Sequence, residues 1–531
     1  MSTVAKKVIM GSGAVDAYEI DQSLIFDDGG VASMVRTPSS TGNRKTWTLS
    51  VWLKRVDFAT GSPNGYQMIY GGQAAHESTI RTVDNKLNIT GWTGSATEFN
   101  WGNTRELRDP SAWFHLVVAF DSTQGTDTNR IKVYINGVQE TPAGSITWPS
   151  QNLDTRMNLS GVTQYIGRYH NPAYSYNGYM AEFNWLDGTA AAASSFGETN
   201  DDTGQWIPKK YSGSYGTNGF YLKFASGALG TDSSGEGNNY TASNLANSDV
   251  VTDSPTNNFA TLNPLFTASV NNTYSEGNLK TVCPNSTKGL CVATIVPTAG
   301  KYYAEFKTTA GFADYPMVGV FDVSSATTTS STVSTVSTKN IGYYAYNGQI
   351  LAGPSGAVLD TVASWAVNDI IAVAIDYDNS TVKWYKNNTL VFTKSSADLK
   401  DVTFAFSGTS GSSGYTIEAN FGQKTLAYTP PSGYVALSTA NLPDPAIPLP
   451  SAHFNTVLYT GDDGTSHAIT GVGHQPDFTW IKNRSATNNH ILTDAVRGVT
   501  KTLLSDTTSA ELTIAQGLKA FGSDGFTVGF D

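Results

Sequence analysis

The pattern that most constrains this chain is a sequence of strand, loop, strand and tight turn that occurs twice. The first copy covers residues 113–140 and reads WFHLVVAFDSTQGTDTNRIKVYINGVQE. Its apolar residues alternate through 114–120 and again through 131–135, which is the period of half-buried strands. Asn136-Gly137 then supplies the two positive φ angles of a type I′ turn. The stretch is therefore predicted to be an antiparallel meander.

The second copy covers residues 365–392. Within it, IIAVAIDYDNSTVKWYKNNTLVF repeats the arrangement, with Val382 and Trp384 alternating and Asn387-Asn388 at the turn. Two copies so far apart predict two β-sandwiches in tandem.

Composition supports an all-β chain of several domains. A chain of 531 residues exceeds what one core organises, and three or four domains are expected. Only 15% of the residues are charged and 51 are glycine, which is typical of many short strands joined by turns. The fold class is therefore predicted to be all-β, with tandem antiparallel sandwiches.

Charge and hydropathy exclude several kinds of partner. The net charge is −11 and no basic run occurs, so neither nucleic acid nor an anionic membrane surface is an expected partner. No segment has the apolar length of a signal peptide or a membrane span, so we expect a soluble protein that is not secreted by the usual route.

The two cysteines, Cys283 and Cys291, allow two interpretations. A chain without a secretory signal folds in a reducing compartment, which favours free thiols over a short disulfide. Neither cysteine has neighbours spaced for zinc.

The first sandwich is predicted over residues 22–226. TWTLSVWLKR at 46–55, the first meander, YIGR at 165–168 and NGYMAEFNWLDG at 177–188 supply its strands. In the last of these, alternation predicts that Tyr179, Ala181, Phe183 and Trp185 share one face. These strands together resemble a laminin G-like, concanavalin A-type lectin domain, which implies a jelly-roll fold. The resemblance does not define function, because that fold carries lectins, adhesive modules and glycanases.

The second sandwich is predicted over residues 265–437. The segments KYYAEFKTT at 301–309, MVGVFDV at 317–323 and NFGQKTLAYTPPSGYVAL at 420–437, with the second meander, resemble a SPRY-type domain. Such domains bind peptides or other ligands through variable loops, so the resemblance implies a fold and no particular ligand.

The remaining segments are predicted as connections and ends. Residues 227–264 contain no strand pattern and form a docked connector, and residues 438–453 are a proline-rich linker. Residues 454–531 form a partial β-rich module, which is either truncated or completed by another copy. Residues 1–21 form an N-terminal arm for attachment. FGETNDDTGQWIPKKY at 196–211, with the connector, resembles virion proteins of tailed bacteriophages.

No catalytic residue is predicted. A retaining glycanase on this fold needs two carboxyl groups about 5–5.5 Å apart. Glu182 is the candidate acid, but Asn184 occupies the next position on the same face of the strand and Asp187 points to the other face. No other hydrolase or phosphate-binding motif occurs.

Four loop carboxylates could hold calcium, although no cofactor or metal site is assigned. They follow the first strand of each meander, and the preferred interpretation is that they close the loops as Asx-turns. They are Asp121, Asp127, Asp376 and Asp378.

Aromatic residues in turn-rich stretches are the candidate ligand-binding residues. Trp92 and Trp101 flank GSATEFN, and Tyr174 and Tyr176 lie in HNPAYSYNGY. Exposed rings beside amides and hydroxyls stack on the C–H faces of sugars. The alternative is that these rings fill the ends of the sandwich.

These features predict a virion protein, foremost a tail fibre or other host-recognition protein. It would bind other virion proteins through its arm and a host surface glycan or protein through its sandwich loops. Assembly in the host cytoplasm, exposure on the particle and a homo-oligomer, foremost a trimer, are expected. A capsid decoration protein or another purely structural virion protein is the alternative, and a glycan depolymerase is disfavoured.

Overall fold

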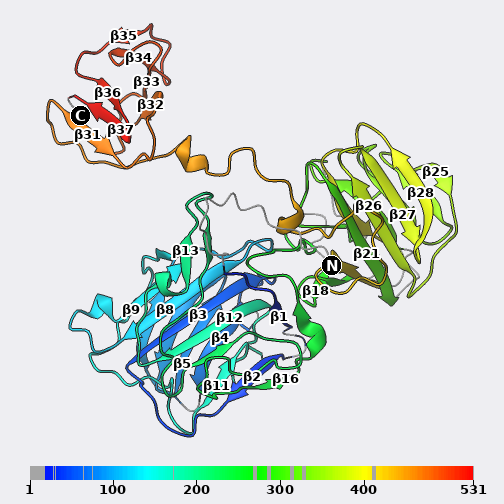
Figure 1. The fold of residues 1–531 in the computed structure, drawn as a ribbon, viewed down its shortest axis with the longest axis horizontal. Coiled ribbons are helices and arrows are strands. Elements are labelled where there is room, and N and C mark those ends of the chain that lie inside the picture. Colours follow the sequence, from blue (N-terminus) through cyan, green and yellow to red (C-terminus); the bar gives the residue numbers. More distant parts are fainter. Residues whose placement is uncertain are drawn as a thin grey trace, which may run out of the picture. The chain divides into compact units, whose positions relative to one another are not determined.

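The computed structural model describes residues 18–529 except 28, 30, 64, 74–75, 172, 267–271, 284–288, 311–315, 326–330 and 409–413. They form two compact units (Figure 1): the first extends to Pro443 without Thr199–Gln205, and the second combines Thr199–Gln205 with the chain from Asp444 onward. The predicted all-β fold class is confirmed, because the described residues contain strands and short 3₁₀ turns. These turns are η2 (Asp127–Asn129), η3 (Ala193–Ser195), η4 (Asn247–Asp249), η6 (Thr439–Asn441) and η7 (Pro450–Ala452). None of the described helical segments is long and apolar enough to span a bilayer.

The first sandwich consists of two antiparallel sheets, named A and B here. In spatial order, sheet A contains β10 (Val138–Gln139), β9 (Ile131–Ile135), β8 (Phe114–Asp121), β3 (Thr46–Arg55), β12 (Gly178–Asp187), β1 (Ser23–Phe26) and β17 (Val250–Val251), with β15 (Phe220–Leu222) also paired to β12. Sheet B contains β16 (Thr241–Ser243), β2 (Ser33–Arg36), β11 (Thr163–Ile166), β4 (Tyr66–Gln73), β5 (Glu77–Val83), β6 (Lys86–Trp92) and β7 (Thr97–Gly102). A two-stranded ribbon of β13 (Gly197–Thr199) and β14 (Trp206–Pro208) lies between β12 and β15 in the sequence.

Large aromatic residues fill the space between sheets A and B. Trp47 of β3 stacks on Phe120 of β8 at 4.8 Å and on Trp185 of β12 at 5.0 Å between ring centroids. All three rings are fully buried. The predicted turn after β9 is confirmed, since Asn136 and Gly137 have φ angles of 48° and 79°. The alternation in the first meander therefore sets the core of this sandwich.

The alternation predicted for β12 is wrong at its middle. The register with β3 shifts between Ala181 and Asn184, and Glu182 has a φ of 51°. This bulge places Tyr179 and Ala181 on the outer face of sheet A, whereas Phe183 and Trp185 join the core. A single inserted residue therefore changes which side chains in the second half of the strand point into the core.

Segments outside the predicted sandwich complete its sheets. The connector contributes β16 to the edge of sheet B and β17 to the edge of sheet A. Sequence reasoning found no strand there because these strands have only three and two residues. Of the predicted arm, residues 1–17 lie outside the described residues. Tyr18 and Ile20 pack against Trp52 and Ala181 on the outer face of sheet A.

The second sandwich also consists of two antiparallel sheets, named C and D. Sheet C contains β18 (Thr273–Ser275), β19 (Lys280–Cys283), β30 (Tyr415–Asn420), β21 (Lys301–Ala310), β26 (Ile370–Asp376), β27 (Thr381–Lys386) and β28 (Thr389–Ser395). Sheet D contains β20 (Cys291–Val292), β29 (Val402–Ser407), β22 (Met317–Asp322), β23 (Ile341–Tyr344), β24 (Gln349–Ala352) and β25 (Ala357–Thr361). The second meander is β26 to β28, and its turn residues Asn387 and Asn388 have φ angles of 44° and 67°, as predicted.

One apolar cluster joins the two sandwiches within the first unit. It includes Ile25 and Tyr179 of the first sandwich, Leu262 of the connector, and Leu279 and Phe421 of the second sandwich. The Tyr179 hydroxyl also donates a hydrogen bond to the Gly277 carbonyl at 2.6 Å. Cys283 and Cys291, which are both buried and form no disulfide, belong to the same cluster.

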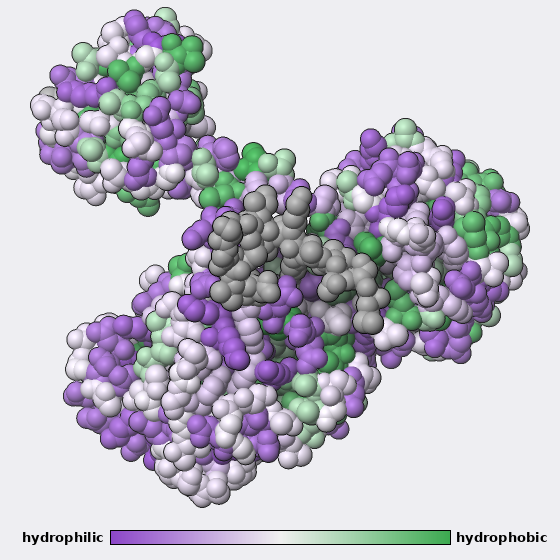
Figure 2. Space-filling model, viewed as in Figure 1, coloured by the Kyte–Doolittle hydropathy of each residue, from purple (hydrophilic) through white to green (hydrophobic). Residues whose placement is uncertain are grey.

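The C-terminal module has two small sheets, named E and F. Sheet E contains β31 (His467–Thr470), β37 (Gly525–Val528) and β36 (Leu518–Gly522), and sheet F contains β32 (Phe478–Ile481), β33 (Ile491–Asp494), β34 (Lys501–Leu504) and β35 (Leu512–Thr513). Figure 2 shows apolar residues among polar ones on the visible face of this module. Phe478 and Trp480 of β32 are 51% and 62% exposed. Two large aromatic rings of this module are therefore mostly exposed to solvent.

The first sandwich buries one histidine, His115, between two aromatic rings. His115 of β8 lies between the rings of Trp52 and Trp206, whose centroids are 4.7 Å and 6.1 Å from its own. The Trp206 indole donates to Nδ1 at 3.0 Å, so Nε2 carries the proton and donates to the Ser50 hydroxyl at 2.8 Å. Burial lowers the pKa of His115 to about 3, and the folded state therefore holds it neutral.

We predict that His115 destabilises the fold as pH falls below its unfolded pKa of about 6.5. Because the folded pKa is lower, the unfolded chain binds the proton first, and stability decreases by up to about 1.4 kcal/mol for each pH unit until about pH 3. Urea unfolding followed by tryptophan fluorescence should show a shallower pH dependence for His115→Gln than for the wild type. The exposed His453 is the control. Equal slopes for the wild type and His115→Gln would contradict this prediction.

Candidate functional site

The outer face of sheet B brings polar and aromatic side chains together. Along β5, Ile80 points into the core, so Glu77, Thr79 and Arg81 point outward. Arg81 pairs with Met68 of β4 on one side and with Asn88 of β6 on the other. Side chains from three neighbouring strands therefore meet on this face, around Arg81.

A pocket of about 210 Å³ opens on this face. It lies between β4, β5 and the loop of residues 167–177, which follows β11. It is lined by Ser62, Tyr66, Met68, Arg81, Tyr169 and Tyr174. Tyr174 meets Tyr66 and Tyr169 edge-on, with ring centroids 5.6 Å apart in both pairs. We name these six residues the tyrosine pocket.

Arg81 is held at the wall of the tyrosine pocket from two sides. Its guanidinium carbon lies 5.3 Å from the centre of the Tyr66 ring. Its Nε donates to Asn88 Oδ1 at 3.0 Å, and Asn88 Nδ2 in turn donates to Asn100 Oδ1 at 2.8 Å. Burial lowers the pKa of Arg81, but an arginine remains protonated at neutral pH. The pocket therefore carries a positively charged, oriented guanidinium.

One carboxylate, Glu77, lies next to this group. It accepts a hydrogen bond from the Tyr169 hydroxyl, and burial together with this bond raises the pKa of Tyr169. The bond ties the loop of residues 167–177 to β5. It fixes the position of Tyr169 above the sheet.

This arrangement suits a small ring-shaped polar ligand. Aromatic faces contact the C–H surface of a sugar, and a guanidinium donates to its oxygens. A volume of about 210 Å³ is below the usual range of about 300–1,000 Å³ for drug-sized ligands, so the tyrosine pocket suits one sugar unit of a longer chain.

The structure separates the four aromatic residues predicted from the sequence. Tyr174 lines the tyrosine pocket, and Trp92 lies on the same face, opposite Glu77, with 39% of its surface exposed. Trp101 and Tyr176 are instead core residues, 1% and 0% exposed. The alternative interpretation applies to these two, because their rings fill the sandwich interior, where a sugar has no access to their faces.

Sequence reasoning missed Tyr66, Arg81 and Tyr169. Alternation in ESTIRTV at 77–83 places Arg81 outward, and this signal was available. Tyr169 had no such signal, since it comes from a loop whose path over the sheet depends on its bond to Glu77.

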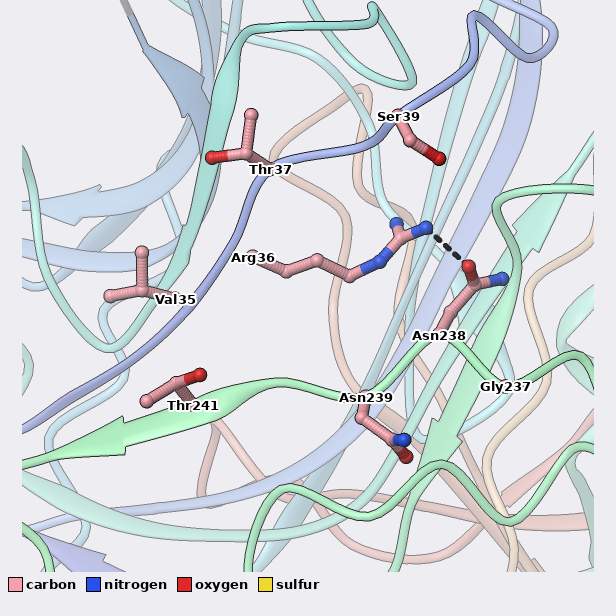
Figure 3. A pocket seen from close by; sticks show the side chains of 8 residues that line it. All are labelled: Val35, Arg36, Thr37, Ser39, Gly237, Asn238, Asn239 and Thr241. Atoms are coloured by element: carbon pink, nitrogen blue, oxygen red, sulfur yellow. Dashed lines mark hydrogen bonds between the residues drawn. The ribbon is translucent and has the colours of Figure 1, made fainter.

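A second, larger hollow of about 610 Å³ lies at the other edge of sheet B (Figure 3). Val35 and Arg36 of β2, Thr241 of β16 and the loop around Asn238 contribute to its lining. The Arg36 guanidinium donates to Asn238 and, at 3.1 Å, to Asn218. Arg36 therefore joins the connector to β2. None of the residues that line the larger hollow is aromatic.

Glu182 occupies a covered position on the outer face of sheet A. Its carboxylate accepts hydrogen bonds from the Tyr18 hydroxyl at 2.9 Å and from the Tyr221 hydroxyl. Burial raises the pKa of Glu182. Asn184 accepts a hydrogen bond from Tyr215 at 2.8 Å. Tyrosine hydroxyls therefore surround the only carboxylate that the sequence offered as a candidate acid.

The loop carboxylates bond nearby backbone amides. Asp121 accepts from the Thr123 amide at 3.1 Å, Asp127 from the Thr128 amide at 2.7 Å and Asp376 from the Asn379 amide at 3.0 Å. Asp378 accepts from the Gly300 amide at 2.8 Å. These bonds agree with loop closure, and the described residues contain no cluster of three metal-ligating side chains.

Comparisons with known proteins agree with this fold. Residues 28–194 match the family described as Concanavalin A-like lectin/glucanases superfamily, and residues 449–531 match a family described as Domain of unknown function (DUF7483). The chain therefore carries a concanavalin A-like lectin domain of the laminin G type. A comparison with curated proteins finds no significant match.

Several solved structures are similar to parts of the chain. The SPRY domain of human HERC1 is 19% identical, with 28% of this chain and 91% of that chain covered and a TM-score of 0.24. A candidate carbohydrate-binding protein from Bacteroides ovatus is 16% identical, with coverages of 42% and 58% and a TM-score of 0.30. A pentraxin from Limulus polyphemus is 14% identical, with coverages of 33% and 80% and a TM-score of 0.24.

We predict opposite effects for the two tryptophans that the sequence grouped together. Trp101→Ala should lower the free energy of unfolding by about 3–5 kcal/mol because it leaves a cavity in the core. Trp92→Ala should change it by less than about 0.5 kcal/mol, since the ring lies at the surface. Urea denaturation of both variants measures the difference. Similar losses in the two variants would show that the outward facing of Trp92 is wrong.

Proposed function

We propose that this protein binds carbohydrate through the tyrosine pocket. The observation that carries the proposal is the meeting of Tyr66, Tyr169 and Tyr174 with Arg81 on the outer face of sheet B. The match of residues 28–194 to a lectin and glucanase superfamily supports it.

We propose binding without hydrolysis. Glu182 is covered by Tyr18 and bonded by two tyrosine hydroxyls, and Asn184 stands at the neighbouring same-face position. A pair of carboxyl groups across a sugar, which glycosidases require, is not supported by this arrangement.

The biological role we propose is host recognition by a virion appendage, foremost a tail fibre. It rests on the sequence resemblance of residues 196–211 and of the connector to phage virion proteins. Binding of a surface glycan would attach the particle to its host, and a homo-oligomer would multiply weak contacts. The exposed Phe478 and Trp480 favour a second candidate, a structural virion protein that contacts its neighbours through the C-terminal module.

We predict that the wild-type protein binds members of a glycan array and that Tyr66→Ala and Tyr174→Ala each weaken this binding about threefold to tenfold, because a stacking surface is lost. Tyr346→Ala, which removes a 57% exposed ring from the second sandwich, is the matched control and should leave binding unchanged. Titration calorimetry with the tightest array ligand measures the change. Absence of binding by the folded wild type would reject the proposed function.

We predict that deletion of residues 1–17 leaves glycan binding unchanged and abolishes incorporation into particles. Residues 18–21 must stay, since Tyr18 and Ile20 cover the outer face of sheet A. Particle-bound protein, detected by immunoblot after purification of virions, is the measurement. Normal incorporation of the shortened chain would refute the attachment role of the arm.

A further inference from the structure

We propose that the tyrosine pocket selects sugars that carry a carboxylate, with the two terminal nitrogens of Arg81 as the recognition group. The ligand class is an acidic glycan, whose carboxylate belongs either to a uronic acid or to a sialic acid. This inference rests on the proposed function and adds the charge of the ligand.

Within the described residues, the two terminal nitrogens of Arg81 form neither a hydrogen bond nor an ion pair, although the charge of Glu77 acts on the guanidinium from beyond ion-pair distance. Among the described residues, no carboxylate lies within ion-pair distance of Arg81, and its one hydrogen bond uses Nε. Arg55 and Arg130 show the contrasting arrangement, because their terminal nitrogens donate to the carbonyls of Leu107 and Pro149, both at 2.7 Å. The terminal nitrogens of Arg81 are therefore the hydrogen-bond donors that the pocket offers to a ligand.

The guanidinium of Arg81 is also fixed in its orientation. The bond from Nε to Asn88 and the Tyr66 ring at 5.3 Å hold the guanidinium plane in place. The two terminal N–H groups then form a fork that matches the two oxygens of a carboxylate. A lysine at this position would supply charge without the fork.

The overall charge of the protein does not favour an acidic ligand. The chain has a net charge of −11, so its overall field repels anions at long range. Glu77, the carboxylate nearest along β5, adds to this repulsion and also acts on the charge of Arg81, while its Oε2 accepts a bond from Tyr169. Preference for an acidic sugar must therefore come from direct pairing in the pocket, where a neutral sugar would leave the terminal nitrogens of Arg81 without a charged hydrogen-bond acceptor.

The test is a glycan array that carries uronic-acid, sialic-acid and sulfated oligosaccharides, each beside its neutral counterpart. The tightest carboxylate ligand and its methyl ester are then compared by titration calorimetry with the wild type and with Arg81→Gln, Arg81→Lys, Lys86→Gln and Tyr174→Ala. Lys86, on the same outer face but outside the pocket, is the matched control for loss of one positive charge. Circular dichroism confirms that each variant is folded.

We expect the wild type to prefer the acid over its ester by about tenfold or more, the usual effect of a charged hydrogen-bonded pair. Arg81→Gln should abolish this preference and Arg81→Lys should reduce it, whereas Lys86→Gln should keep it within about twofold of the wild-type value. Tyr174→Ala should weaken acid and ester equally, since it removes stacking. The uronic-acid and sialic-acid sets of the array identify which source supplies the carboxylate.

Equal affinity for acid and ester, a preference confined to sulfated ligands, or an unchanged preference in Arg81→Gln would overturn this inference and leave the proposed function intact. Binding to no glycan would reject the proposed function itself. The comparison of acid with ester in the wild type decides the matter even where a variant does not fold.

Discussion

The buried ion pair of Lys54 and Asp253 is the interaction on which the first unit depends. Lys54 comes from the middle of sheet A, and both side chains are fully buried, with Nζ 2.8 Å from the carboxylate. Lys54 also donates to Asn258 at 2.7 Å and to the Phe259 carbonyl at 2.9 Å, while Trp113 donates to Asp253 at 2.9 Å. Loss of either charge would leave the other buried alone, at a cost of about 3–5 kcal/mol. The ion pair therefore fixes the position of the connector on sheet A.

The outer faces of sheets A and B therefore differ in how far they are covered by the rest of the chain. The outer face of sheet A is covered by other parts of the chain. Tyr18, Ile20 and Trp206 pack on one part of it, and the apolar cluster shared with the second sandwich packs on another. The outer face of sheet B retains the tyrosine pocket and the exposed indole of Trp92. Because one sheet is covered by packing, the proposed ligand binding falls to the outer face of the other sheet. The same constraint explains why Glu182, on the covered face, is bonded by tyrosines of its own chain.

Much of the fold could be predicted from residue alternation, and much of the site could not. Alternation located both meanders and their turns because period-two burial and Asn at positive φ are local properties. The bulge at Glu182 was not predicted, because nothing in NGYMAEFNWLDG distinguishes the inserted residue from its neighbours. Trp92 and Trp101 were grouped as turn residues, although KLNITGW and TEFNWG place them on opposite faces when their strands are paired. Tyr66 and Tyr169 line one pocket only through tertiary packing, which no short sequence pattern predicts.

The most direct test of this account is hydrogen–deuterium exchange of the full chain with and without a bound glycan. Binding at the tyrosine pocket should protect the backbone amides of residues 66–83 and of the loop at 167–177, because ligand contacts damp local opening of both segments. Residues 35–39 and 237–241 around the larger hollow should exchange at unchanged rates. Protection of that hollow alone, or of the second sandwich alone, would contradict the claim that the outer face of sheet B binds the ligand at the tyrosine pocket.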